Sequence, residues 1–251
     1  MTQVPKPKGM LFDMVRCAGC RKCVQACLDC HGFQHDADDV QELSATAFTS
    51  MVEKEDGAVR NMCRHCIDPA CASVCPVGAL IKTDEGPVVY DEDKCIGCRY
   101  CMVACPFSIP RYEWDERVPA VQKCDMCIDR IREGGVPACA EACDYEATLF
   151  GTREELLCEA RTRIADDPDE YHDHVYGEVE IGGTSVLFLA PNPGEDFGYK
   201  PILGTAPLPS LTMQQLNRVP PIVVGGSAAL MAIWWITSRR DEVRAAEGRQ
   251  S

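Results

Sequence analysis

Sixteen of the 18 cysteines fall into four groups of four, and their spacing suits the binding of iron–sulfur clusters. The groups are Cys17, Cys20, Cys23 and Cys27; Cys63, Cys66, Cys71 and Cys75; Cys95, Cys98, Cys101 and Cys105; and Cys124, Cys127, Cys139 and Cys143. The third group reads Cys-x2-Cys-x2-Cys-x3-Cys-Pro. In this spacing three thiolates hold one [4Fe–4S] cubane while the fourth reaches a neighbouring cluster. The sequence therefore predicts sixteen iron ligands and an electron carrier.

Two of the groups depart from this pattern. The first keeps the spacing but has Leu28 where proline would follow, and the fourth has eleven residues between Cys127 and Cys139 and ends before Asp144. A longer loop between ligands is tolerated because the entropic cost of closing it rises slowly with length. We therefore expect both outer groups to bind clusters as well.

Disulfides and zinc are the alternative uses of so many cysteines. A Cys-x2-Cys-x2-Cys run cannot pair its own members without severe strain, and disulfide frameworks belong to short secreted scaffolds. Zinc sites use separated Cys-x2-Cys pairs and have no use for a third cysteine at the same spacing. Iron–sulfur ligation is the better interpretation, and a colourless zinc scaffold is the rival that a metal assay would detect.

The remaining composition indicates what the chain does not do. It has 251 residues with a formal net charge of −14, which disfavours nucleic acid as a partner because binding it requires clustered Lys and Arg. We find no nucleophile with a base beside it, no open metal site and no phosphate loop. No catalytic residue is predicted, so the chain is not expected to be an enzyme by itself.

Several elements can be predicted from patterning. We expect strands at residues 10–16 and 87–91, a strand or hairpin around 46–52, and helical turns after the fourth cysteine of each group. An amphipathic helix is predicted at residues 153–164, ended by Asp166-Asp167-Pro168, with Cys158 as a small buried or half-buried residue. Gly182-Gly183-Thr184 is interpreted as a turn into a buried strand, and His172 and His174 as surface or docking residues.

One membrane span is predicted near the C-terminus. Residues 219–237 carry no charge, and at 1.5 Å per residue they reach about 28 Å, close to the thickness of a bilayer's hydrocarbon core. Pro220-Pro221 suit a helix start, and Trp234-Trp235 suit an interfacial belt. Small residues at 225–229 would let another membrane helix pack closely.

Flanking charge predicts the orientation of this span. Arg239, Arg240, Arg244 and Arg249 follow it, whereas only Arg218 directly precedes it. The positive-inside rule then places the C-terminus in the cytoplasm and the cluster domain on the periplasmic or outer face. The polar, proline-rich stretch at residues 1–8 has no features of an export signal, so export would occur in the folded state with a partner that carries one.

Three sequence segments show a family resemblance: CRHCIDPACASVCPVGAL at 63–80, KCIGCRYCMVACPF at 94–107, and CDMCIDR with FGTREELL between 124 and 157. Over residues 10–165 the chain resembles the four-cluster ferredoxin-like subunits of membrane-bound respiratory oxidoreductases. The later stretch HVYGEVEIGGTSVLFLA, followed by one span, is similar to the membrane-anchored iron–sulfur subunit of periplasmic nickel–iron hydrogenase and to the beta subunit of formate dehydrogenase.

The resemblance implies an α+β fold of two intertwined bacterial-type (two-cluster) ferredoxin-like domains that exchange their fourth cysteines, with a C-terminal extension and a single transmembrane helix. The implied domains are an outer one at 10–60 and 112–150, an inner one at 61–111, a docking extension at 151–213, a transmembrane helix at 214–240 and a cytoplasmic tail at 241–251. Four [4Fe–4S] clusters are implied. Their ligand sets would be Cys17, Cys20, Cys23 with Cys143; Cys124, Cys127, Cys139 with Cys27; Cys63, Cys66, Cys71 with Cys105; and Cys95, Cys98, Cys101 with Cys75.

The resemblance also implies the partners. The chain would relay electrons in a hetero-oligomeric complex between a catalytic subunit, with a hydrogenase as the first choice, and a quinone-reactive integral membrane subunit. A formate dehydrogenase or another molybdopterin oxidoreductase is the alternative. A soluble regulatory or shuttle iron–sulfur protein is the rival from a different class, and high salt should wash such a protein off membranes.

Overall fold

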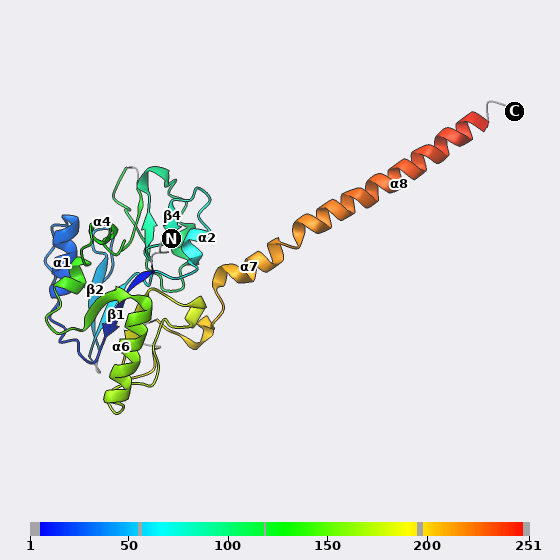
Figure 1. The fold of residues 1–251 in the computed structure, drawn as a ribbon. Coiled ribbons are helices and arrows are strands. Elements are labelled where there is room, and N and C mark those ends of the chain that lie inside the picture. The colour runs from blue at the N-terminus through cyan, green and yellow to red at the C-terminus, as the bar shows by residue number, and fades with distance from the viewer. Residues whose placement is uncertain (1–5, 55–56, 118, 195–197, 248–251) are drawn as a thin grey trace. The chain divides into compact units, whose positions relative to one another are not determined.

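The fold is described from a computed structural model, which covers residues 6–54, 57–117, 119–194 and 198–247 (Figure 1). The chain divides into two units, residues 1–209 and 210–251. Strands, mostly in consecutive pairs, and short helices are interspersed along the first unit, so this part is a mixed α/β structure.

The described strands are short. They are β1 (Lys8–Asp13), β2 (Thr49–Lys54), β3 (Gly57–Met62), β4 (Leu80–Lys82), β5 (Val88–Tyr90), β6 (Arg111–Tyr112), β7 (Val121–Gln122), β8 (Thr148–Thr152) and β9 (Val186–Leu189). Strand β1 is central to a three-stranded sheet, antiparallel to β8 and parallel to β9. The other strands form three antiparallel pairs, β2–β3, β4–β5 and β6–β7. The expected strands at 10–16 and 87–91 and the expected hairpin around 46–52 are therefore present, with shifted bounds.

The helices of the first unit are short except for two. They are α1 (Lys22–His31), α2 (Ala70–Ser73), α3 (Tyr100–Ala104), α4 (Ile128–Arg132), α5 (Ala138–Glu141) and α6 (Arg153–Asp166), with 3-10 turns at Glu92–Lys94, Glu180–Gly182 and Pro201–Leu203. Helix α6 confirms the predicted amphipathic helix. It begins with a capping box in which the side chains of Thr152 and Glu155 each accept the other's backbone N–H.

Strand β1 separates two cores because successive side chains point to opposite faces. Leu11 packs in one core with Leu156, Ala160 and Ile164 of α6. Met10 and Phe12 belong to the other core, which also contains five buried cysteines: Cys23, Cys27, Cys63, Cys124 and Cys139. Figure 1 shows α6 lying along the sheet. The sheet therefore carries α6 on one face and the cysteine-rich core on the other.

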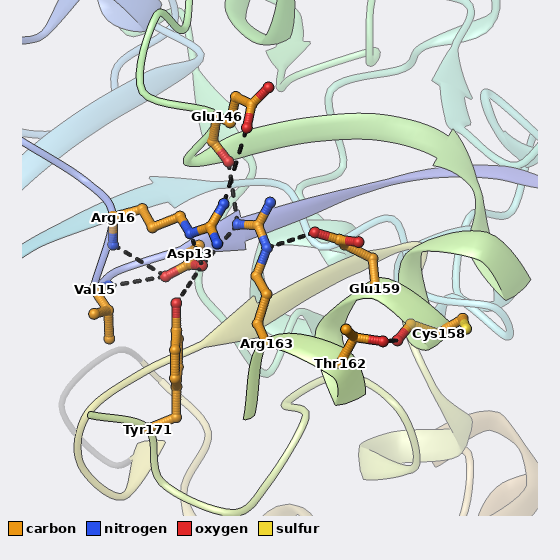
Figure 2. A network of polar contacts seen from close by, with 9 residues as sticks. All are labelled: Asp13, Val15, Arg16, Glu146, Cys158, Glu159, Thr162, Arg163 and Tyr171. Atoms are coloured by element: carbon orange, nitrogen blue, oxygen red, sulfur yellow. Dashed lines mark hydrogen bonds and ion pairs between the residues drawn. The ribbon is translucent and has the colours of Figure 1, made fainter. Parts of the chain in front are cut away.

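Asp13 fixes the chain where it leaves β1 for the first cysteine group. Its carboxylate is fully buried and accepts hydrogen bonds from the backbone N–H groups of Val15 and Arg16 at 3.0 and 3.1 Å. It also accepts one from the Arg163 guanidinium at 2.7 Å and one from the Tyr171 hydroxyl at 2.8 Å (Figure 2). This network joins the loop before Cys17 to α6.

One expectation about a side chain needs correction. Cys158 is exposed rather than buried, because its position on α6 lies away from the sheet, and in Figure 2 its sulfur points away from the polar network. His172 and His174 are half-buried, and each has a local partner: His172 bonds the Tyr176 hydroxyl at 3.0 Å and His174 bonds Glu180 at 2.6 Å, while a docking role for them stays a prediction.

The turn predicted before a buried strand is confirmed. Gly182 and Gly183 adopt φ values of 84° and 90°, in the left-handed region that favours glycine. Every residue of the following strand β9 is buried.

The C-terminal unit is helical. Its helices are α7 (Leu208–Leu216) and α8 (Val219–Glu247), and α8 starts at the predicted place, with Pro220 and Pro221 in its first turn. Within the described residues, the run Leu208–Arg244 is the one helical stretch that is long and apolar enough to cross a membrane, and an 18-residue segment of it has a mean hydropathy of 1.7. Its large apolar side chains, among them Leu230, Trp234 and Trp235, are exposed.

Candidate iron–sulfur cluster site

The four cysteine groups share one backbone feature that the sequence does not show. The second residue after the first cysteine has a positive φ in every group: 67° at Gly19, 48° at His65, 67° at Gly97 and 62° at Met126. A left-handed residue turns the backbone so that consecutive N–H groups face one side, which suits an anion. The N–H groups of Gly97 and Met126 accordingly donate to the sulfurs of Cys95 and Cys124, each at 3.4 Å.

A second left-handed residue follows the fourth cysteine by three positions in three groups. These residues are Gly78, Ser108 and Glu146, with φ values of 64°, 51° and 51°. Such a conformation is incompatible with a continuing helix. The expectation of helical turns after the fourth cysteines is therefore wrong for these groups. The turns α2, α3 and α5 come before the fourth cysteine, and in the first group α1 runs through Cys27 and ends at His31, with Gly32 as its C-cap.

Backbone N–H groups converge on Cys75 in particular. The Ala79 N–H donates to its sulfur at 3.2 Å. Burial alone would raise the pKa of this thiol, but hydrogen bonds from the backbone of residues 77–80 outweigh burial and lower it. Hydrogen bonds of this kind stabilise a thiolate and tune the reduction potential of a cluster that it binds.

The sulfurs of the outer cysteine groups lie together in two mixed sets. Burial raises the pKa of Cys17, and the neighbouring thiolates of Cys23, Cys143 and Cys20 raise it further, so these four form the first set. Burial likewise raises the pKa of Cys27, and Cys139 and Cys127 raise it further. Burial also raises the pKa of Cys124, to which Cys27 and Cys139 add. The second set is therefore Cys27, Cys124, Cys127 and Cys139. Cys143 thus lies near the first group and Cys27 near the fourth, and the binding of one cluster by each set stays a prediction.

The inner groups mix in the same way. Burial raises the pKa of Cys66, and Cys63, Cys105 and Cys71 add to the effect, so these four cysteines form the third set. The pKa of Cys101 is raised to about 11, first by burial and then by Cys95 and Cys98. Cys75 and Cys71 both pack in the small core that contains Cys101, so a fourth set of Cys75, Cys95, Cys98 and Cys101 stays a prediction. Iron binding by the sixteen cysteines, and their division into four ligand sets, stay predictions.

The sets follow one another in a row. Cys23 of the first set interacts with Cys139 of the second. Cys124 of the second interacts with Cys63 of the third. Cys71 of the third interacts with Cys101 of the fourth. The order of the row is therefore first, second, third and fourth set.

Buried cations lie among these thiols, and no sequence pattern predicts them. Arg60, Arg64 and Lys123 are 1%, 3% and 5% exposed, and Lys82 is half-buried. Burial lowers the pKa of Lys82 to about 8 against the opposing effect of Cys66 and Cys63, and Lys123 lies near enough to Cys71 to lower the pKa of that thiol. A buried cation is costly unless negative charge lies beside it. Burial of these cations is therefore expected if the core contains anionic, thiolate-bound clusters.

His65 adds a buried donor between two of the predicted ligands. It is fully buried, and its Nδ1 accepts the backbone N–H of Val88 at 2.9 Å, which leaves the ring proton on Nε2. Among the described residues this Nε2 has no hydrogen-bond partner. His65 belongs to the ligand loop that carries Cys63 and Cys66, and a cluster sulfide is an acceptor that would suit its buried donor. The donor set as a whole, soft thiolates with N–H groups and cations around them, fits a [4Fe–4S] cluster.

The fold and the site define an iron–sulfur protein, and sequence comparison agrees. Residues 56–153, which contain twelve of the sixteen cysteines, match the family described as the 4Fe-4S dicluster domain. The chain is similar to the hydrogenase-2 operon protein HybA of Escherichia coli O157:H7, with 37% identity over 77% of this chain and 73% of that protein.

Two further relatives belong to other complexes. The nitrate-inducible formate dehydrogenase iron–sulfur subunit of Escherichia coli K12 is 34% identical over 71% of this chain and 66% of its own length. One of the polypeptides of the anaerobic dimethyl sulfoxide reductase of Shigella flexneri is 40% identical over 59% of this chain and 75% of its own length. The chain belongs to this family of iron–sulfur electron-transfer subunits of oxidoreductase complexes, as the sequence resemblance predicts.

Proposed function

We propose that the chain holds four [4Fe–4S] clusters, one in each set of cysteines, in two intertwined ferredoxin-like domains. The proposal is supported by thiols of different cysteine groups that lie near one another: Cys143 near Cys17, Cys27 near Cys124, and Cys105 near Cys66. The clusters supply one-electron carriers when bound. The residues of the chain fix their spacing, exclude water and set their potentials through N–H donors and buried cations.

The two ends of the row of clusters are where partner subunits would dock. We assign a catalytic subunit and a quinone-reactive integral membrane subunit to this chain, in a hetero-oligomeric complex. Similarity to HybA extends over more of this chain than similarity to the formate dehydrogenase subunit, which favours a hydrogenase as the catalytic partner. A formate dehydrogenase is the second candidate, supported by 34% identity over 71% of the chain.

The C-terminal helix supports a membrane anchor. An exposed apolar helix of this length is poorly suited to water, and the arginines that follow residue 237 suit the cytoplasmic side. We place the cluster domain on the periplasmic or outer face and the C-terminus in the cytoplasm. The implied tail at 241–251 lies partly outside the described residues.

Quinone reduction by native membranes tests this function. Hydrogen or formate is added anaerobically to membranes from wild-type cells and from cells that lack this chain. A hydrogen-dependent reduction that is lost without the chain supports a hydrogenase partner, and a formate-dependent one supports the second candidate. Unchanged rates with both donors contradict the proposed relay. Protease treatment of intact cells, before and after the outer membrane is opened, tests the orientation.

A further inference from the structure

Arg60 is a buried cation that the cysteine pattern does not explain. It lies on β3, the second strand of the hairpin inserted between the first two cysteine groups, and is 1% exposed. Its Nε donates to the Thr49 hydroxyl at 3.0 Å, and its NH1 donates to the Thr148 hydroxyl at 3.3 Å. These two threonines, on β2 and β8, hold the guanidinium in one place.

The guanidinium of Arg60 interacts with cysteine side chains. Its guanidinium hydrogen-bonds the Cys139 side chain and interacts with Cys23 and Cys124. Cys23 belongs to the first thiol set, whereas Cys139 and Cys124 belong to the second. Among the described residues, no carboxylate forms an ion pair with Arg60, although the chain as a whole has an excess of acidic residues. The neighbouring negative charge is therefore that of the two thiol sets.

We propose that Arg60 is a positioning residue that lies between the two outer clusters and raises their reduction potentials. The inference rests on the proposed four-cluster function. One-electron reduction makes a cluster more negative, so a permanent positive charge beside it stabilises the reduced form. An arginine suits this role because its guanidinium stays charged and can donate in several directions at once. Anchored by Thr49 and Thr148, it reaches sulfurs of both outer sets.

Redox titration of the purified complex, followed by electron paramagnetic resonance, tests the proposal. In Arg60→Gln we expect the titration steps of two clusters to move to more negative potential, while the other two titrate as in wild type. The reduced-to-oxidised ratio of the affected clusters should fall at least tenfold at a fixed potential, a shift of about 59 mV for a one-electron couple. Arg60→Lys keeps the charge and should titrate closer to wild type than Arg60→Gln does.

Arg64→Gln is the matched control. Arg64 is another buried arginine, but its guanidinium lies 3.9 Å from the centre of the Phe188 ring and interacts with Cys63, Cys105 and Cys66 of the third set. Its replacement should shift a different step of the titration from Arg60→Gln. The same step shifting in both variants contradicts the assignment of Arg60 to the outer pair.

Iron analysis separates failure of this inference from failure of the proposed function. Wild-type protein with far fewer than about sixteen irons per chain contradicts the four-cluster proposal itself. Wild-type protein with the full complement, together with unshifted potentials in Arg60→Gln, overturns only the role of Arg60. If Arg60→Gln loses iron, the iron content of Arg60→Lys is the deciding measurement. Clusters retained in Arg60→Lys support a role for the positive charge, and loss of iron in Arg60→Lys as well overturns the proposed role of Arg60.

Discussion

The Arg163 guanidinium donates to the Asp13 carboxylate at 2.7 Å, and these two residues, 150 positions apart, are 3% and 0% exposed. Asp13 ends β1 four residues before Cys17, and Arg163 lies on α6 beyond the last cysteine group. Asp13 also receives the N–H groups of Val15 and Arg16. The pair therefore connects the start of the first ligand loop to the element that covers the far face of the sheet.

Breaking this pair should be strongly destabilising. Asp13→Asn leaves Arg163 with only the more exposed Glu159, and Arg163→Met leaves Asp13 with only the longer ion pair to Arg16, so we expect a loss of about 3–5 kcal/mol in the free energy of unfolding. Glu159→Gln is the control, because Glu159 pairs with the same arginine but is itself 43% exposed and should contribute about 0–1 kcal/mol. Denaturant titration followed by far-UV circular dichroism measures the free energy of unfolding of each of the three variants. Equal losses in all three variants would contradict the account.

Gly97 should be essential for the fourth set of cysteines. Its φ is 67°, its N–H donates to the Cys95 sulfur, and a Cβ there would meet the Tyr112 hydroxyl at 3.0 Å. A β-branched side chain is strongly disfavoured in this conformation. We expect Gly97→Val to lose one cluster, or about four irons per chain.

Gly32→Ala is the control for this variant. Gly32 has a similar φ of 71°, but no atom lies within 4 Å of the place that a Cβ would take, and no bond joins it to a cysteine sulfur among the described residues. The variant should keep its iron and cost only about 1–2 kcal/mol in the free energy of unfolding. Iron content is measured after anaerobic purification. A full complement of iron in Gly97→Val would show that the left-handed turn is dispensable.

Removal of the clusters should unfold the first unit. Burial raises the pKa of most of the predicted ligands, for example that of Cys71 to about 12, and Arg60 and Lys123 would be left without anionic sulfur beside them. Ligand ionisation, metal binding and folding are then coupled. We expect oxidation and iron chelation to abolish the far-UV signal of the strands together with the visible absorbance. A folded apo-protein would contradict this coupling.

The C-terminal helix should be separable from the cluster domain. A chain that ends at Pro209 keeps the first unit intact and lacks the exposed apolar helix α8. We expect it to retain its iron and to be soluble without detergent, while the full-length chain stays with membranes in high salt. A truncated protein that still requires detergent would place membrane binding elsewhere in the chain.

Much of this arrangement is visible in the sequence because cysteine spacing and hydrophobic patterning are local signals. The β2–β3 hairpin, helix α6 and the start of α8 follow from such patterns. The left-handed residues at His65 and Met126 do not, since their conformation is imposed by the ligand loop and only Gly19 and Gly97 indicate it by residue type. The position of the helical turns before the fourth cysteines is missed for the same reason.

The buried cations could not be predicted because burial of a charge depends on tertiary contacts. Arg60 lies in a polar-looking hairpin, and only packing of that hairpin against β8 brings it to sulfurs from both outer groups. The exposure of Cys158 likewise depends on which face of α6 meets the sheet. Hydrophobic periodicity places Cys158 near the edge of the apolar face of α6, which does not determine whether its side chain is buried.

Chemical analysis of anaerobically purified protein tests the central claim most directly. Four cubane clusters predict about sixteen irons and about sixteen acid-labile sulfides per chain, with the broad visible absorbance of iron–sulfur proteins. A colourless protein that contains zinc, or one with only a few irons per chain, would contradict the account.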